Sequence, residues 1–203
     1  MPKQPTKQKA YTNTLVELEQ VWWKRLLNVQ APYKWNVNRL CKGLVLDVGC
    51  GIGRNLSHLG DRVVGVDHNA YSIALCRQRG FVAFTEDEFL KSRYHKAESF
   101  DTLLLSHVLE HMIRSHAVNL ILRYRKLLKK GARIVIITPQ EAGFHRHETH
   151  VEFMDFSVLG GILRETGFKV HSQFSFPFPR LVGRIFPYNE FIVVGKCVGF
   201  ELE

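Results

Sequence analysis

A glycine-rich segment in the first quarter of the chain has the residue types of a ligand site. Residues 44–56 are LVLDVGCGIGRNL, which is an apolar run typical of a buried strand, three glycines, and a segment typical of a helix. Glycines at this point let the backbone turn tightly and approach a ligand closely. Asp47 precedes the glycines, and its carboxylate suits a ligand that carries an ammonium group. The segment predicts a site beyond the carboxyl end of the first strand.

The same segment argues against a nicotinamide dinucleotide. The dinucleotide fingerprint requires a third glycine five residues after the first. Counted from Gly49, that position is Arg54, and counted from Gly51 it is Leu56. The charge of Asp47 would also repel a pyrophosphate. We therefore expect a different cofactor.

A second carboxylate stands at the end of the next predicted strand. The segment VVGVDHN places Asp67 20 residues after Asp47. A carboxylate at this position can accept two hydrogen bonds from ribose hydroxyls. The glycine segment and Asp67 together predict a ligand that contains a ribose.

Strand-like and helix-like segments alternate from Gly43 onward, which predicts an α/β fold with a mostly parallel sheet covered on both faces. The expected strands are Leu44–Val48, Arg62–Asp67, Phe81–Thr85, Phe100–Leu105, Ala132–Thr138, Phe168–Ser175 and Glu190–Cys197. The expected helices lie at about 54–60, 70–79, 87–95, 115–129 and 155–167.

The amino-terminal segment is expected to form a lid. Residues 1–11 are polar and basic and predict a disordered tail, and residues 12–40 are the expected lid region. Thr14 and Glu17 form a capping box that starts a helix, and Pro32 is expected to end it. No linker composition divides residues 1–203, so we expect one domain.

The chain resembles the class I S-adenosylmethionine-dependent methyltransferases. It is most similar to the small-molecule methylases related to quinone-biosynthesis enzymes. The similarity covers about residues 43–140, in the stretches VLDVGCGIGR, VVGVDHN, TEDEF, SFDTLLLSHVLEHM and LLKKGARIVIITPQ. It implies a Rossmann-like, doubly wound, seven-stranded sheet and S-adenosylmethionine as cofactor.

The resemblance also implies cofactor contacts. The glycines would line the methionine part, Asp47 its amino group, Asp67 the ribose and Asp87 the adenine amine. The full expected set is Asp47, Gly49, Gly51, Gly53, Arg54, Asp67, His68, Asp87, Glu88, Ser106 and His107. Two alternatives stay open at the adenine end: the assignment could be shifted by one position, or the acids of TEDEF could cap the next helix.

Methyl transfer to a hydroxyl also needs a group that takes its proton, and a histidine suits that role. His150, in the segment after the fifth strand, is the expected general base, and His107 is the reserve. His150 could instead order its loop, which also contains His145 and His147. The expected acceptor-binding residues are His111, Phe178, Arg180, Tyr188 and Tyr33, although the aromatic ones could simply close the core.

No metal is expected from the sequence. His107 and His111 stand four residues apart, as two zinc ligands on one helix face would. No third ligand can be identified from spacing alone.

The predicted function is methyl transfer from S-adenosylmethionine to a small-molecule acceptor by in-line displacement. The alternatives are an RNA methyltransferase and a non-catalytic S-adenosylmethionine-binding protein. The net charge of +9 could attract nucleic acid, but the basic residues are spread along the chain, so no specific nucleic acid partner is expected. The four cysteines have no metal-ligand spacing, and no secretory or membrane-spanning segment is seen, so we expect a cytoplasmic protein with reduced thiols. The acceptor atom and the oligomeric state are left open.

Overall fold

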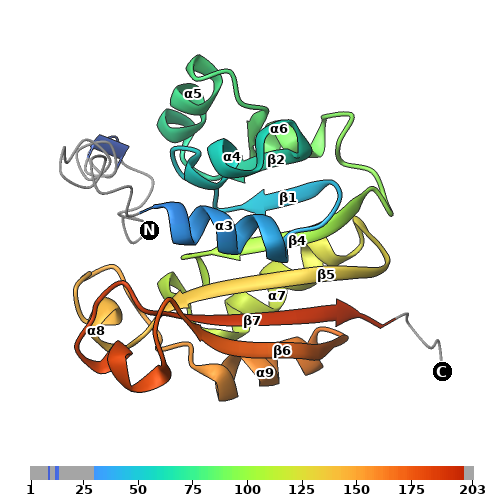
Figure 1. Ribbon diagram of the computed structural model, residues 1–203. Helices are drawn as coiled ribbons and strands as arrows, with labels where there is room; N and C mark the ends of the chain where they lie inside the picture. The colour runs from blue at the N-terminus through green and yellow to red at the C-terminus, as the bar shows by residue number, and fades with distance from the viewer. Residues whose placement is uncertain (1–8, 10–11, 14–29, 199–203) are drawn as a thin grey trace.

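The computed structural model describes residues 9, 12, 13 and 30–198. Their centre is a seven-stranded sheet with the strand order β3-β2-β1-β4-β5-β7-β6 (Figure 1). The strands are β1 Val45–Val48, β2 Val63–Asp67, β3 Ala83–Thr85, β4 Phe100–Ser106, β5 Leu128–Pro139, β6 Phe168–Phe176 and β7 Glu190–Cys197. The order reverses beside β1, which is where sheets of this kind bind their ligands.

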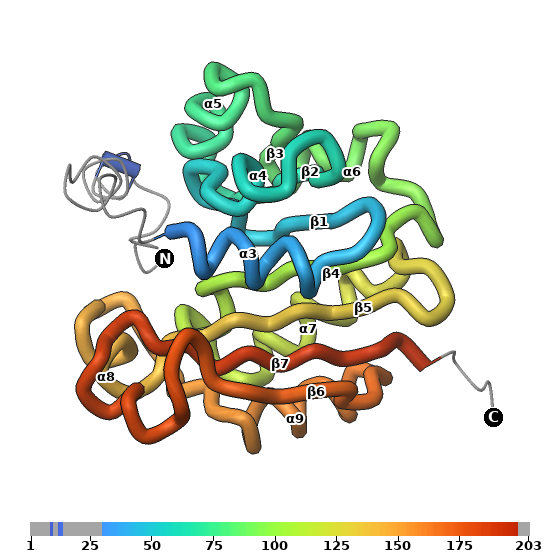
Figure 2. Tube along the Cα trace, viewed as in Figure 1, coloured from blue at the N-terminus to red at the C-terminus, as the bar shows by residue number. Residues whose placement is uncertain are grey.

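The first five strands run parallel, and β7 lies antiparallel between β5 and β6. Since β5 and β6 both pair antiparallel with β7, they run in the same direction. The segments after β1, β2, β4, β5 and β6 therefore leave the sheet on the same side, at the left in Figure 2. We call this side, where the carboxyl ends of the parallel strands lie, the carboxyl edge of the sheet. These strand directions confirm the predicted doubly wound, mostly parallel α/β fold.

Helices cover both faces of the sheet (Figure 1). One apolar core packs β-strand side chains against α3, α4 and α5, and the other packs them against α6, α7 and α9. The strands supply both cores by alternation, as in β4, where Leu104 faces one core and Leu103 and Leu105 face the other. The helices are α3 Ala31–Leu40, α4 Arg54–Leu59, α5 Ala70–Gln78, α6 Glu86–Leu90, α7 Arg114–Arg125, α8 Glu141–Phe144 and α9 Phe156–Glu165, with 3-10 turns η2 Gly60–Arg62, η3 Leu109–His111 and η4 Arg180–Arg184.

Two predicted helices are too long. The helix expected to reach residue 129 ends at Arg125, and β5 begins at Leu128 because Leu128 pairs with Phe100 of β4. The helix expected to reach residue 95 ends at Leu90, where the hydroxyl of Ser92 donates to the carbonyl of Phe89 and the chain turns. In both cases the prediction extended the helix too far at its carboxyl end, because the residues that follow include charged ones with good helix propensity.

Pro32 has the opposite role to the one predicted. It lies in the first turn of α3, where its missing N–H is not needed, so it begins a helix. The predicted capping box at Thr14 and Glu17 lies outside the described residues. The hydroxyl of Thr12 lies 3.0 Å from that of Ser72, so Thr12 contacts α5.

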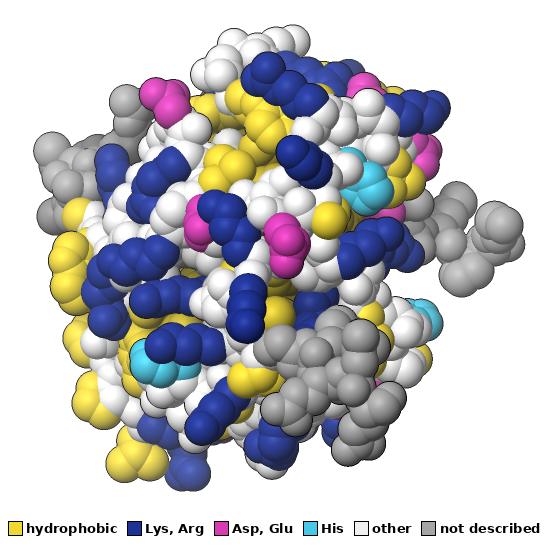
Figure 3. Space-filling view, turned by 90° about the vertical axis from the view of Figure 1, so that its right-hand side faces the viewer, with side chains coloured by type: hydrophobic (Ala, Val, Ile, Leu, Met, Phe, Trp, Pro, Cys, Tyr) yellow, Lys and Arg dark blue, Asp and Glu magenta, His cyan; other side chains and the backbone are white. Residues whose placement is uncertain are grey.

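Lysine and arginine side chains are abundant on the face that contains the carboxyl end of β7, with few acidic groups between them (Figure 3). This face lies at the amino ends of the parallel strands, away from the edge with the glycine segment. No described helix is long and apolar enough to cross a membrane. All four cysteines have free thiols.

We predict that Gly49→Ala destabilises the protein more than Gly80→Ala does. Both glycines have positive φ, at which alanine costs roughly 1–2 kcal/mol. A Cβ at Gly49 would also lie 2.4 Å from a methyl group of Val108, whereas one at Gly80 would meet nothing within 4 Å. Urea unfolding should show the difference, and Val108→Ala should recover part of it in the Gly49→Ala background. Equal losses for the two alanine variants would contradict the close packing at Gly49.

Candidate cofactor and acceptor site

Asp47 is a fully buried acid at the carboxyl edge of the sheet. It lies on β1, two residues before Gly49, and neither carboxylate oxygen has a hydrogen-bond partner with good geometry among the described residues. Burial raises the pKa of Asp47 to about 7, although the Asn55 amide and the charge of Arg54 act in the opposite direction. A carboxylate in this position is costly unless a cationic ligand pairs with it.

Asp67 organises the glycine segment. Its Oδ2 accepts a hydrogen bond of 2.8 Å from the N–H of Gly51, and its Oδ1 accepts one of 2.8 Å from the N–H of Asn69. A carboxylate can accept about four hydrogen bonds, and these two are the backbone ones that the described residues supply, so there is room for a ligand. His68 follows, with Nδ1 3.9 Å from Asp67 Oδ1.

The acidic turn TEDEF caps a helix. Thr85 and Glu88 form a reciprocal capping box at the start of α6, as one of the two sequence alternatives proposed. Glu88 also accepts a 2.6 Å hydrogen bond from Arg77, which lowers the pKa of Glu88 to about 2. Its side chain is therefore used within the protein. Asp87 is exposed at the same edge as Asp67, and its contact with adenine stays a prediction.

His107 directly follows β4 in a strained conformation. Its φ of 58° lies in the left-handed region, which is uncommon for residues other than glycine and is frequent at functional sites. Its Nε2 lies 2.8 Å from Glu190 and its Nδ1 lies 3.3 Å from Glu110. Burial alone would lower the pKa of His107, but the two acids outweigh burial and raise the pKa to about 9. His107 is thus protonated at neutral pH, which disfavours it as the reserve base.

The sequence grouped the wrong histidines. His107 lies outside the short turn η3, so it does not share a helix face with His111 as its spacing suggested. Instead, His111 lies beside His150, with their ring centroids 5.0 Å apart. Glu110, His111 and His150 each present one ligand atom, and these atoms lie within 4.8 Å of one another. The structure therefore groups His111 with Glu110 and His150 and not with His107.

The segments after β5 and β6 are joined by a buried amide network. Gln140 donates to Ser175 and to the carbonyl of Glu190, and Asn189 donates to Gln140. Asn189 also bonds the backbone N–H of Phe178 at 2.9 Å. These amides fix the start of the segment that contains η4.

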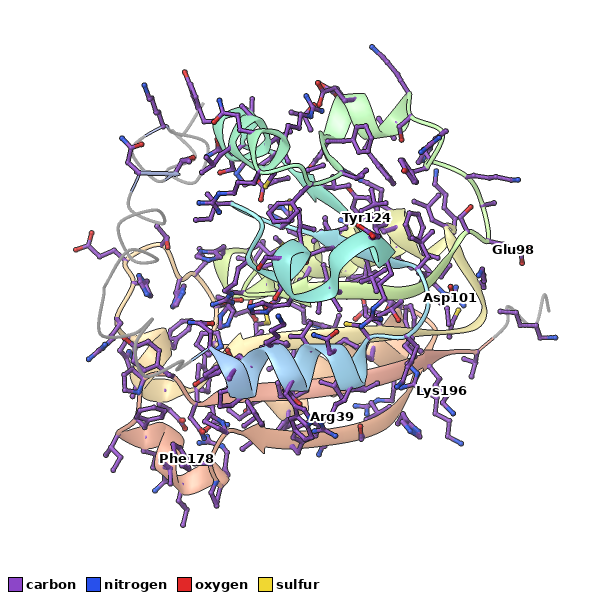
Figure 4. All side chains as sticks on the ribbon, turned by 45° about the horizontal axis from the view of Figure 1, so that its top comes forward. Arg39, Glu98, Asp101, Tyr124, Phe178 and Lys196 are labelled. Atoms are coloured by element: carbon purple, nitrogen blue, oxygen red, sulfur yellow. The ribbon has the colours of Figure 1, made fainter. Side chains whose placement is uncertain are left out.

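Arg180, predicted to bind the acceptor, has an acidic partner within the protein. Its guanidinium makes a bidentate pair with Glu141 on α8, so a substrate acid would have to displace an existing partner. Phe178 and Tyr188 are each about half exposed, and both contact the ring of Phe186 edge-on. Figure 4 shows Phe178 at the left end of the sheet, opposite to Asp101 and Lys196. These aromatic residues therefore do not close the core, and they leave apolar surface at the edge with the glycine segment.

Tyr33 of α3 connects the amino-terminal part to this edge. Its hydroxyl donates to the carbonyl of Tyr188, and its ring packs edge-on against Phe176. A small cavity lies between α3, α4 and the ends of the central strands. Its lining residues are Tyr33, Asn36, Val37, Arg54, Asn55, His58, Ser106, Ile137 and Glu190.

Several residues of the site were missed by sequence reasoning. Glu190 is the clearest case, because the acid that holds His107 lies 83 residues further along the chain. Gln140 and Asn189 were also missed, and they lie 49 residues apart. No spacing pattern connects such pairs, since the antiparallel placement of β7 beside β5 brings them together.

The family comparison agrees with the site. Residues 23–173 match the model of a methyltransferase domain family, so the chain belongs to that family. A comparison with proteins of curated function finds no match.

Solved structures with the same fold include several methyltransferases. An S-adenosylmethionine-dependent methyltransferase from Archaeoglobus fulgidus is 24% identical, with a TM-score of 0.63 over 81% of this chain and 92% of that one. A 1,6-didemethyltoxoflavin-N1-methyltransferase from Burkholderia thailandensis, solved with its substrate and S-adenosylhomocysteine, is 17% identical, with a TM-score of 0.63 over 94% and 86%. A magnesium protoporphyrin IX methyltransferase from Synechocystis, solved with S-adenosylmethionine, is 16% identical, with a TM-score of 0.57 over 86% and 79%.

The chain is thus a member of the methyltransferase domain family and has the fold of solved methyltransferases that depend on S-adenosylmethionine. The residues present fit that cofactor. Among the described residues, no hydrogen bond with good geometry reaches the carboxylate of Asp47, which suits an ammonium group, and Asp67 accepts only two, which leaves room for a ribose. The positive φ of Gly49 and Gly53 keeps the intervening backbone tightly turned.

We predict that Asp47→Asn stabilises the free protein above neutral pH and weakens cofactor binding. The pKa of Asp47 is raised on folding, so folded protein keeps a proton that unfolded protein loses. Stability of the wild type should therefore fall as pH rises from the ordinary aspartate value to about 7, and the variant should lack this loss. Thermal unfolding at several pH values measures it.

Cofactor affinity of the wild type should rise with pH, whereas its stability should fall. Below about pH 7, Asp47 holds its proton and cannot pair with an ammonium group, so wild-type affinity should rise about tenfold from about pH 6 to about pH 8. Calorimetry with Asp47→Asn should show a lower cofactor affinity that depends less on pH. Asp101→Asn, at the opposite end of the sheet in Figure 4, is the control and should bind as the wild type does. A variant that binds normally at every pH would contradict the assignment of Asp47.

Proposed function

We propose that this protein transfers the methyl group of S-adenosylmethionine to a small molecule bound between the segments that follow β4, β5 and β6. The observation that carries the proposal is the buried, unpartnered Asp47 beneath a tightly turned glycine segment. This arrangement favours a cofactor with an ammonium group over a phosphate-containing one. The segment after β4 lies next in the sheet, so an acceptor there is beside the cofactor site.

The cofactor-binding roles follow the predicted set. Asp47 pairs with the amino group, Gly49, Gly51 and Gly53 contact the methionine part, and Arg54 begins the helix behind them. Asp67 binds the ribose. The remaining contacts, around the adenine and the sulfur, are assigned to His68, Asp87, Glu88, Ser106 and His107.

The bound cofactor supplies an activated methyl group on a sulfonium. The contribution of the protein is alignment and exclusion of water. His107, fixed between Glu110 and Glu190, orders the backbone at the end of β4. The amide pair Gln140 and Asn189 orders the segments on the other side of the acceptor space.

A small acceptor suits the surface at this edge. Phe178 and Tyr188 offer exposed rings, and Tyr33 connects to them from α3. Two of the methyltransferases with this fold, from Burkholderia thailandensis and Synechocystis, are named for small-molecule substrates. The basic surface of Figure 3 lies at the other end of the strands, so it gives no reason to place a nucleic acid at the site.

His150 is the histidine with the more suitable protonation state. Burial lowers the pKa of His150, although the hydrogen bond with the carbonyl of Phe144 acts in the opposite direction. Its Nδ1 donates to that carbonyl at 2.7 Å, since a carbonyl only accepts. Its Nε2 therefore has a lone pair at neutral pH and can take part in removing a proton from the acceptor.

We predict that Asp67→Ala weakens binding of S-adenosylmethionine without unfolding the protein. Loss of the charge-assisted ribose bonds should cost roughly 1.5–3 kcal/mol each. Titration calorimetry measures the loss, with exposed Asp61→Ala on η2 as the control. NAD should not compete in the wild type. Unchanged affinity in Asp67→Ala, or saturable competition by NAD, would contradict the proposed cofactor site.

We predict that His150→Ala lowers turnover by ~10²–10⁴-fold and leaves cofactor affinity intact. Wild-type turnover should rise as pH passes upward through a pKa below the ordinary histidine value, because only neutral His150 is active. His145→Ala, on the same loop, is the control. If His150 only orders the loop, the variant should instead show a raised KM or a lower Tm with near-normal turnover.

A further inference from the structure

Glu110, His111 and His150 form a cluster of side chains that could bind a metal ion. Glu110 and His111 belong to η3 after β4, and His150 lies in the segment between α8 and α9. One carboxylate oxygen and one ring nitrogen from each histidine lie within 4.8 Å of one another. At bond lengths of about 2.1 Å the ligands of one ion lie within about 4.2 Å of one another, so a small side-chain movement would bring these three atoms around one metal ion.

Backbone carbonyls fix which nitrogen of each histidine carries the proton. His111 Nδ1 lies 3.0 Å from the carbonyl of Thr149, and His150 Nδ1 lies 2.7 Å from the carbonyl of Phe144. A carbonyl accepts only, so in each neutral ring Nδ1 carries the proton and Nε2 carries the lone pair. Metal-binding histidines are oriented in this way by backbone carbonyls.

Glu110 is a buried acid that shares a cationic neighbour, His107, with another acid. Its side chain is fully buried, and neither carboxylate oxygen has a hydrogen-bond partner with good geometry among the described residues. The nearest charged group is His107, but the Nε2 of that same ring is used by Glu190 at 2.8 Å. Two acids thus share one imidazole, and a buried acid without sufficient partners is costly.

The backbone holds the cluster together. The carbonyl of Glu110 accepts hydrogen bonds from the N–H groups of Val151 at 2.7 Å and Glu152 at 3.3 Å. The side chain of Glu152 in turn accepts a 2.6 Å hydrogen bond from the N–H of Arg114. The two segments are therefore fastened next to the proposed ligands, which pre-organises the site.

We propose that Glu110, His111 and His150 bind one divalent transition-metal ion, of which Zn²⁺ is the reference case. Two imidazoles and one carboxylate are a donor set found for catalytic zinc and for non-haem iron, and they leave positions open for another ligand. The open positions lie at the carboxyl ends of β4 and β5, where the proposed function places the acceptor.

The ion would bind and activate a hydroxyl group of the acceptor. This step rests on the proposed function: a hydroxyl oxygen of the acceptor takes an open position, and the cation makes that hydroxyl more acidic. Its proton leaves to water, an O–CH3 bond forms, and the S–CH3 bond of the sulfonium breaks with its electron pair staying on sulfur. In this inference His150 is a metal ligand, which replaces the role of base given to it under the proposed function, and the acceptor class is a hydroxyl compound.

Metal binding can be tested without any acceptor. The full chain is stripped with a chelator and titrated with Zn²⁺ by calorimetry and with Co²⁺ by its visible absorption spectrum. We expect one ion per chain, a higher Tm with Zn²⁺, and at least about a tenfold loss of affinity in Glu110→Gln and in His150→Ala. His145→Ala, a matched histidine of the same loop, should bind as the wild type does.

Binding of S-adenosylhomocysteine to each variant shows that it is folded and keeps the cofactor site. Absence of stoichiometric metal binding in wild type, or equal affinity in Glu110→Gln and wild type, would overturn the metal site. Methylation of a hydroxyl acceptor that persists at full rate after chelation would overturn the acceptor-orienting role. A wild-type protein that does not bind S-adenosylhomocysteine would instead contradict the proposed function. The metal titration would still decide the metal site, because it uses neither cofactor nor acceptor.

Discussion

Burial of acids at the carboxyl edge of the sheet is the constraint on which the site depends. Asp47 and Glu110 are both fully buried, and no hydrogen bond with good geometry reaches their carboxylate oxygens within the described part of the chain. Removing a carboxylate from water costs several kcal/mol unless a cation or several donors replace the water. A ligand with an ammonium group meets that need at Asp47, and a metal ion meets it at Glu110. Asp47 therefore belongs to the proposed cofactor site, and Glu110 belongs to the proposed acceptor site beside it.

The parallel sheet explains why these acids lie at one edge. Strands that run in the same direction bring their carboxyl ends together, so residues distant in sequence follow β1, β2, β4 and β5 at neighbouring positions. The strain at His107 is part of the same arrangement, because this residue turns the chain directly after β4. Its N–H bonds the carbonyl of Ile137 on β5, which keeps the turn attached to the sheet.

The sheet was predictable from sequence because its strands are short apolar runs bounded by glycine and charged residues. The strand Glu190–Cys197 was predicted with its observed bounds, and the glycine segment with Asp67 predicted the cofactor edge. Boundaries failed where local propensity opposed tertiary pairing, as at Leu128. On the acceptor side, Glu190 and the grouping of Glu110 with His150 were not predictable, because only the strand order brings these distant residues together.

The most direct test of the account is a crystal structure of the protein with S-adenosylhomocysteine, collected from zinc-soaked crystals at the zinc absorption edge. The account predicts the ammonium group of the ligand within hydrogen-bond distance of Asp47, its ribose hydroxyls on Asp67, and one anomalous peak between Glu110, His111 and His150. A ligand bound away from Asp47 and Asp67 would contradict the central claim that this edge is the cofactor site of a methyltransferase.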